Sequence, residues 1–75
     1  MRMRKALKDN DYETYRIDSH SVKSSMAILG MKELSERAKQ HEFAARDGDT
    51  DFIRDDSDAF VTAYEKAVTA MANAL

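Results

Sequence analysis

No proline occurs in this 75-residue chain, and its only two glycines stand at positions 30 and 48. Proline interrupts a helix interior, and glycine commonly follows the last turn of a helix. Residues that favour helices, such as alanine, lysine, glutamate and arginine, are plentiful. The sequence therefore predicts an all-α protein, with one helix ending near Gly30 and another at a turn around Gly48.

Three segments carry apolar residues at alternating spacings of three and four, which places those residues on one face of a helix. The connections between the segments are short, so neighbouring helices should pack antiparallel in an up-down bundle. The predicted helices cover residues 10–29, 32–46 and 50–74. The faces predicted to be buried consist of Tyr12, Tyr15, Ser19, Val22, Met26 and Leu29 in the first helix, Met31, Leu34, Ala38, His41 and Ala45 in the second, and Ile53, Phe60, Ala63, Tyr64, Ala67, Met71 and Ala74 in the third.

Residues 1–9 are locally basic and are interpreted as a lead-in to a single helical domain over residues 10–75. The first helix of that domain is expected to begin at an N-cap on Asn10, with Glu13 as its capping-box partner.

Three helices of this length make a thin core. Ile17, Ile28 and Phe43 also lie off the main apolar faces of their helices. Unpaired apolar surface usually marks a contact with a partner. We therefore expect a fourth helix from another copy, another domain or a segment outside this chain, and a homodimer is the simplest way to supply it.

Bulk properties argue against several classes of protein. The formal net charge is −2, so no overall basic field is available to hold nucleic acid, and the absence of cysteine excludes disulfides and thiolate metal sites. No apolar run approaches the roughly 20 residues of a membrane span, and no signal peptide is visible. We expect a cytoplasmic protein with no cofactor, metal, nucleic-acid or membrane partner.

His20 is the residue most suited to carry chemistry. At about 100° per residue it points away from the apolar face of the first predicted helix, toward solvent. Lys23 lies one turn away, and Ser24, also one turn away, is small enough to leave the ring accessible. Exposure alone is weak evidence, because most exposed histidines on helices have no special role.

His41 is predicted to be different. It lies on the apolar face of the second predicted helix with Ala38 and Ala45. A core or interface histidine that is hydrogen-bonded to a tyrosine or a carboxylate is the favoured interpretation, ahead of a ligand or a second phosphorylation site.

The residues after His20 form a recognisable pattern: a hydrophobic residue two positions on, lysine three on, a small residue four on and glycine ten on. This stretch resembles the histidine-phosphotransfer (HPt) family, and the resemblance covers roughly residues 11–64. Two positions depart from the family pattern, since Ser24 stands where many members have glycine and His41 where a leucine-like residue is usual. The matching residues are Val22, Lys23, Ser24, Gly30, Leu34, Ala38, Glu42, Ala44, Ala45, Arg46, Gly48, Asp49 and Tyr64.

The resemblance implies a four-helix fold and a phosphoryl carrier without catalytic turnover of its own. His20 would be the phosphoacceptor, Lys23 would stabilise the phosphoryl group and Ser24 would keep access open. The partners would be response-regulator receiver domains, a hybrid sensor histidine kinase, or both, in a two-component phosphorelay. The required Mg²⁺ would belong to the receiver. The expected partner-binding residues are Arg16, Ile17, Ala27 and Ile28.

Two other interpretations stay open. The chain could be an interaction module of the same fold whose histidine is not used, or a structural helical oligomer. Ile17 and Ile28 could equally pack on the missing helix instead of contacting a receiver.

Overall fold

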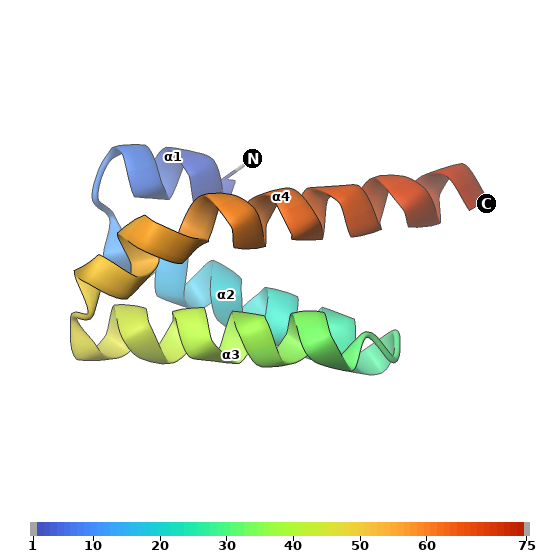
Figure 1. The fold of residues 1–75 in the computed structure, drawn as a ribbon, viewed down its shortest axis with the longest axis horizontal. Coiled ribbons are helices and arrows are strands. Elements are labelled where there is room, and N and C mark those ends of the chain that lie inside the picture. The colour runs from blue at the N-terminus through green and yellow to red at the C-terminus, as the bar shows by residue number, and fades with distance from the viewer. Residues whose placement is uncertain (1, 75) are drawn as a thin grey trace.

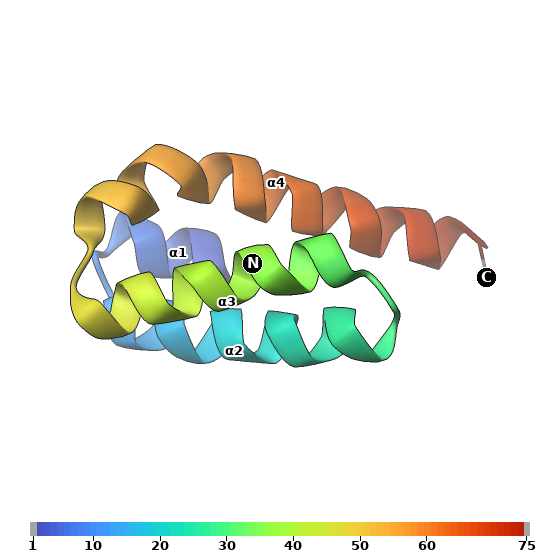
Figure 2. The ribbon, with the colours of Figure 1, turned by 60° about the horizontal axis from the view of Figure 1, so that its bottom comes forward.

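A computed structural model describes residues 2–74, which form four helices joined by short turns (Figure 1). Within these residues there is no strand. Successive helices run in opposite directions in both views, so the bundle is antiparallel and up-down, as predicted (Figures 1 and 2). The helices are α1 (Arg2–Lys8), α2 (Tyr12–Ile28), α3 (Lys32–Asp47) and α4 (Thr50–Ala74).

The fourth helix comes from this chain, so the expectation that it is supplied from outside was wrong. Residues 2–8, which we had interpreted as part of a lead-in, form α1. Met3 and Ala6 of α1 are buried in the core, and Leu7 packs against it. These three positions share one helical face, but two turns are too few for a periodic pattern to stand out. The structural reason for expecting a homodimer is thereby removed.

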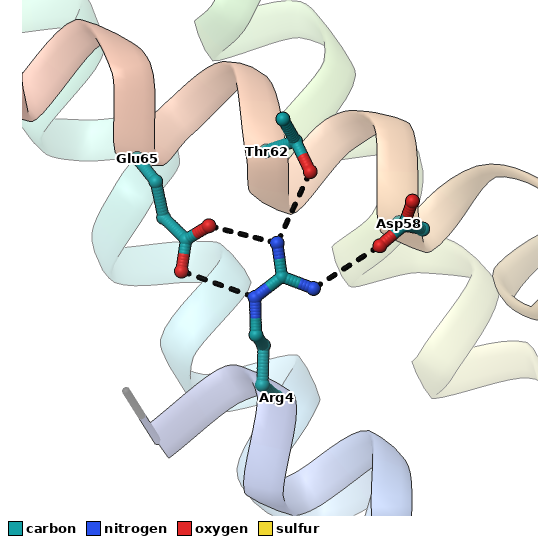
Figure 3. Close-up of polar contacts among 4 residues, drawn as sticks. All are labelled: Arg4, Asp58, Thr62 and Glu65. Atoms are coloured by element: carbon teal, nitrogen blue, oxygen red, sulfur yellow. Dashed lines mark hydrogen bonds and ion pairs between the residues drawn. The ribbon is translucent and has the colours of Figure 1, made fainter.

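Arg4 fastens α1 to α4 (Figure 3). Its guanidinium donates two hydrogen bonds to the Glu65 carboxylate, from Nε at 3.1 Å and from Nη2 at 2.7 Å. The same group donates to Asp58 and Thr62, both at 3.1 Å. The hydrogen bonds to Glu65 and then Asp58 raise the pKa of Arg4, and the bond from Arg4 lowers the pKa of Glu65. A helix of two turns is not stable alone, so α1 depends on such contacts.

The three turns share one hydrogen-bonding pattern. Asn10, Gly30 and Gly48 each have a positive φ, between 55° and 79°. In each turn, the backbone N–H of the following residue donates to the carbonyl of the residue five positions before it, at 2.7 to 2.8 Å. This is the pattern of a Schellman helix end.

The prediction that Asn10 is the N-cap of the next helix was therefore wrong, because Asn10 closes α1. The N-cap of α2 is Asp11, whose side chain accepts from the N–H and the hydroxyl of Thr14 at 3.2 and 2.7 Å. Glu13 pairs instead with Arg16, at 3.5 Å. The prediction placed the capping residue one position too early.

α1 covers only one end of the bundle, because it has 7 residues whereas α4 has 25 (Figure 1).

Leu29, which we expected on the buried face, is exposed, as is Val68 of α4. The buried side chains from α2, α3 and α4 otherwise follow the predicted faces, with Ala44, Ser57 and Val61 in addition. The core residues are Met3, Ala6, Tyr15, Ser19, Val22, Met26, Leu34, Ala38, His41, Ala44, Ile53, Ser57, Phe60 and Val61.

Replacing Arg4 by alanine should release α1 from α4 while leaving α2 and α3 packed. We expect the backbone amides of residues 6–11, which donate within α1 and its closing turn, to exchange hydrogen several times faster in Arg4→Ala, because local opening becomes easier. Hydrogen exchange read by mass spectrometry measures this. Arg54→Ala is the matched control, since the ion pairs of Arg54 within residues 2–74 are with Asp51 and Asp55 of its own helix. Equal exchange of α1 in both variants would show that the Arg4 contacts do not hold it.

Candidate functional site

His20 lies on the outward side of α2, next to the buried Ser19, and its side chain is 58% exposed. The apolar face of α2 is fixed by burial of Tyr15, Val22 and Met26. Since successive residues turn by about 100°, His20 lies well off that apolar face, and its contact with Glu42 places it on the side of α2 next to α3. Its imidazole is thus accessible from solvent while it still touches a neighbouring helix.

The neighbour that His20 meets is Glu42 of α3. His20 Nδ1 lies 3.0 Å from Glu42 Oε2, and the ammonium of Lys23 lies 2.8 Å from Glu42 Oε1. One carboxylate therefore binds both residues of the histidine cluster. Its side chain is only 14% exposed, so the carboxylate lies beneath the two groups that it holds.

Glu42 is ionised under ordinary conditions. Burial opposes ionisation, but hydrogen bonds from Lys23 and His20 outweigh it and lower the pKa of Glu42. An ionised carboxylate only accepts hydrogen bonds, so His20 Nδ1 must carry the proton that it donates. In the neutral imidazole the lone pair then resides on Nε2, the nitrogen that Glu42 does not occupy.

A second contact ties α2 to α3 beside this group. The hydroxyl of Ser35 donates to the backbone carbonyl of Lys23 at 2.9 Å. The position of Lys23 is therefore constrained through both its backbone and its ammonium.

Sequence reasoning missed the role of Glu42, which entered only as an acidic position in the HPt pattern. The helical periodicity of α3 indicates that Glu42 lies beside the buried His41, at the edge of the apolar face. It does not indicate which residue of α2 lies opposite, because that depends on how the two helices are staggered.

The remaining predicted site residues lie around His20. Ser24 and Ala27 are exposed, as expected for positions that leave the ring accessible. Ile17 and Ile28 are also exposed, Ile28 by 85%. Since α1 is present and leaves both isoleucines uncovered, they do not pack on a fourth helix. Arg16 is partly buried.

His41 is a core histidine, as predicted. Its side chain is fully buried, and its two ring nitrogens lie 2.8 Å from the Tyr15 hydroxyl and 2.8 Å from Asp56 Oδ2. The ring stacks on Phe60 with centroids 4.4 Å apart. Asp56 also contacts Arg37, at 3.4 Å. The neutral ring is satisfied when Nε2–H donates to Asp56 and the Tyr15 hydroxyl donates to Nδ1.

Within residues 2–74, no group of three or more His, Cys, Asp or Glu side chains is placed to hold a metal ion. Over the same range, no helix is both long enough and apolar enough to cross a membrane.

Comparison of the chain with protein-family models, with curated proteins and with solved structures found no match.

The buried His41 should make stability depend on pH. Burial lowers the pKa of His41, and this outweighs the opposing effect of Asp56. The unfolded state then binds more protons, so stability is complete above the unfolded pKa of about 6.5 and falls as pH drops below it. Between pH 7.5 and 5.5 we expect a loss of up to about 1 kcal/mol from this residue.

Urea unfolding of the wild type and of His41→Leu at the two pH values measures this effect. The variant should be less stable overall but should lose less stability between pH 7.5 and 5.5. An NMR titration of the wild type tests the same point without a substitution. Protonation of His41 in the folded protein above pH 6.5 would contradict the expectation.

Proposed function

We propose that this chain is a histidine-containing phosphoryl carrier that acts between receiver-domain aspartates in a two-component phosphorelay. The observation that carries the proposal is the Glu42 contact, because it leaves Nε2 of the exposed His20 as the nucleophilic nitrogen. The resemblance of residues 11–64 to the HPt family supplies the class of partner, and the all-helical four-helix fold is compatible with it.

The chemistry needs one nucleophile and one leaving group. The Nε2 lone pair attacks the phosphorus of an aspartyl phosphate, a P–N bond forms, and the P–O bond to the aspartate breaks and releases its carboxylate. The imidazole becomes cationic as this happens, because Nδ1 keeps its proton. The Glu42 carboxylate, 3.0 Å from Nδ1, is placed to stabilise that positive charge. The reverse reaction passes the group to a second receiver.

Lys23 and Ser24 have supporting roles in this proposal. The Lys23 ammonium is held at the same carboxylate as His20, which keeps one positive charge beside the transferred phosphoryl group. Phosphoryl transfer relies mainly on positioning and charge neutralisation, so a single fixed cation is useful. Ser24 is exposed and small, and it leaves room for the approach of a receiver. The acidic pocket and its Mg²⁺ belong to the receiver, and the site is cytoplasmic in this proposal.

A second candidate function is a helical interaction module whose histidine is not phosphorylated. The 85% exposure of Ile28 favours it, because a large aliphatic side chain in water is a typical contact residue. The two candidates differ in whether His20 carries phosphate.

Phosphotransfer from a set of isolated, phosphorylated receiver domains tests the leading proposal. Wild-type protein should acquire acid-labile phosphate, and His20→Gln should acquire none. Ser21→Ala, an exposed neighbour on α2, is the control and should be labelled like the wild type. Equal labelling of the wild type and His20→Gln would remove His20 as the acceptor. No labelling of a folded wild-type protein by any receiver would favour the interaction module.

Glu42 should be a positioning residue in the same reaction. We expect Glu42→Ala to lower the rate of phosphotransfer by about tenfold or more, as for other groups that orient a histidine. Glu42→Gln keeps an acceptor for Nδ1 and should retain more activity than Glu42→Ala. The fraction of neutral His20 that carries its proton on Nδ1, followed by ¹⁵N NMR, should fall in Glu42→Ala because the carboxylate that accepts from Nδ1 is gone. An unchanged tautomer of His20 would mean that the contact does not persist in solution.

A further inference from the structure

Phe43 of α3 is an exposed aromatic side chain that is held in place by two cations. It is 37% exposed. The guanidinium carbon of Arg46 lies 4.5 Å from the ring centroid, and the Lys39 ammonium lies 5.7 Å from it. Cation–π contacts of this kind restrict the ring before any partner arrives. A side chain that is already ordered loses less entropy on binding, so Phe43 is suited to be a contact residue.

This cluster lies beside the His20 site. Phe43 directly follows Glu42, the residue that His20 contacts. Arg46 is one turn beyond Glu42, and although hydrogen bonding to Asp47 makes the largest contribution, the Glu42 carboxylate also raises the pKa of Arg46. Arg46, one of the two cations on Phe43, is therefore close to the carboxylate beneath His20, so the Phe43 cluster begins one turn along α3 from the His20 contact.

Exposed apolar side chains stand on the other side of His20 as well. Counting about 100° per residue from the buried Tyr15, Ile17 and Ile28 lie on the outward face of α2, beyond His20 as seen from α3. Both are exposed. His20 is thus placed between two aliphatic side chains of α2 and an aromatic side chain of α3, which is the composition of the centre of a protein interface.

The charge of the surface indicates what kind of partner fits it. Lys39 makes no ion pair with any residue in the part of the chain that the structure describes. Lys23 pairs with Glu42, and Arg46 pairs with Asp47. Of these three cations, Lys39 is therefore the one that can form an ion pair with a partner protein. An acidic protein surface complements it.

We propose that Phe43, Lys39 and Arg46 form the α3 half of a docking surface for the acidic protein that donates the phosphoryl group. Ile17 and Ile28 form the α2 half. The partner is a protein whose phosphorylated carboxylate lies in an acidic pocket with an apolar rim. This inference rests on the proposed function of His20 and extends it to residues that do not touch the phosphoryl group.

Two phosphoryl donors of different size separate docking from chemistry. Phosphoramidate is a small donor, and its P–N bond breaks to release ammonia as the phosphoryl group bonds to His20 Nε2, without any docked protein. Receiver domains phosphorylated with acetyl phosphate are the large donors. Phe43→Ala should lower kcat/KM for transfer from a receiver by about tenfold, mainly through KM. Labelling by phosphoramidate should be unchanged.

Val68→Ala is the matched control, because Val68 is a 42% exposed apolar residue of α4. It should react like the wild type with both donors. Lys39→Glu should slow transfer from receivers, and added salt should then raise the rate of transfer instead of lowering it. Lys66→Glu, at an exposed lysine of α4, should change neither the rate nor its dependence on salt.

Each other outcome counts against the proposal. If Phe43→Ala slows transfer from both donors, Phe43 acts on the site itself. If it slows transfer from neither donor, docking uses other residues. His20 then remains the acceptor, provided that His20→Gln is unlabelled. Labelling by phosphoramidate but by no receiver would mean that the partner class is wrong. No labelling of the wild type by either donor would overturn the function and this inference together.

Discussion

The hydrogen bond between Tyr15 and His41 fixes the stagger at which α2 and α3 pack, and the rest of the site follows from that stagger. Both side chains are buried, and their polar atoms lie 2.8 Å apart. A slip of either helix by one turn would leave two polar groups in the core without partners, at a cost of about 1–3 kcal/mol for each. In the observed stagger Glu42, the residue after His41, meets His20, which is five positions after Tyr15.

The same buried histidine joins a third helix. Asp56 of α4 accepts from His41 and also contacts Arg37, and these two bonds lower the pKa of Asp56 although partial burial opposes the change. Three helices therefore meet at one imidazole. A leucine at this position would fill the space but would specify no stagger, since apolar contacts lack direction. A buried polar group that specifies one arrangement is consistent with the thin core of a small protein.

Periodicity in the sequence was sufficient for the three long helices, for the exposure of His20 and for the burial of His41, because all of these depend on one helix at a time. It was insufficient where two helices or a turn decide. The role of Glu42 depends on the stagger of α2 against α3. The choice between Asn10 and Asp11 as N-cap depends on a positive φ at Asn10, which belongs to the end of the preceding helix. The helix α1 was missed because it has only two turns, and Arg4 holds it through residues more than fifty positions away.

That separation in sequence has a consequence for the order of folding. The contacts that assemble the His20 site join residues 12 to 26 positions apart, whereas Arg4 reaches Asp58 and Glu65 across 54 and 61 positions. Closing a longer loop costs more chain entropy, so α2 and α3 are expected to pair before α1 docks on α4. Substitutions at Arg4 would then change the unfolding rate far more than the folding rate. The pairing of His20 with Glu42 can accordingly form on a chain whose bundle has not yet closed.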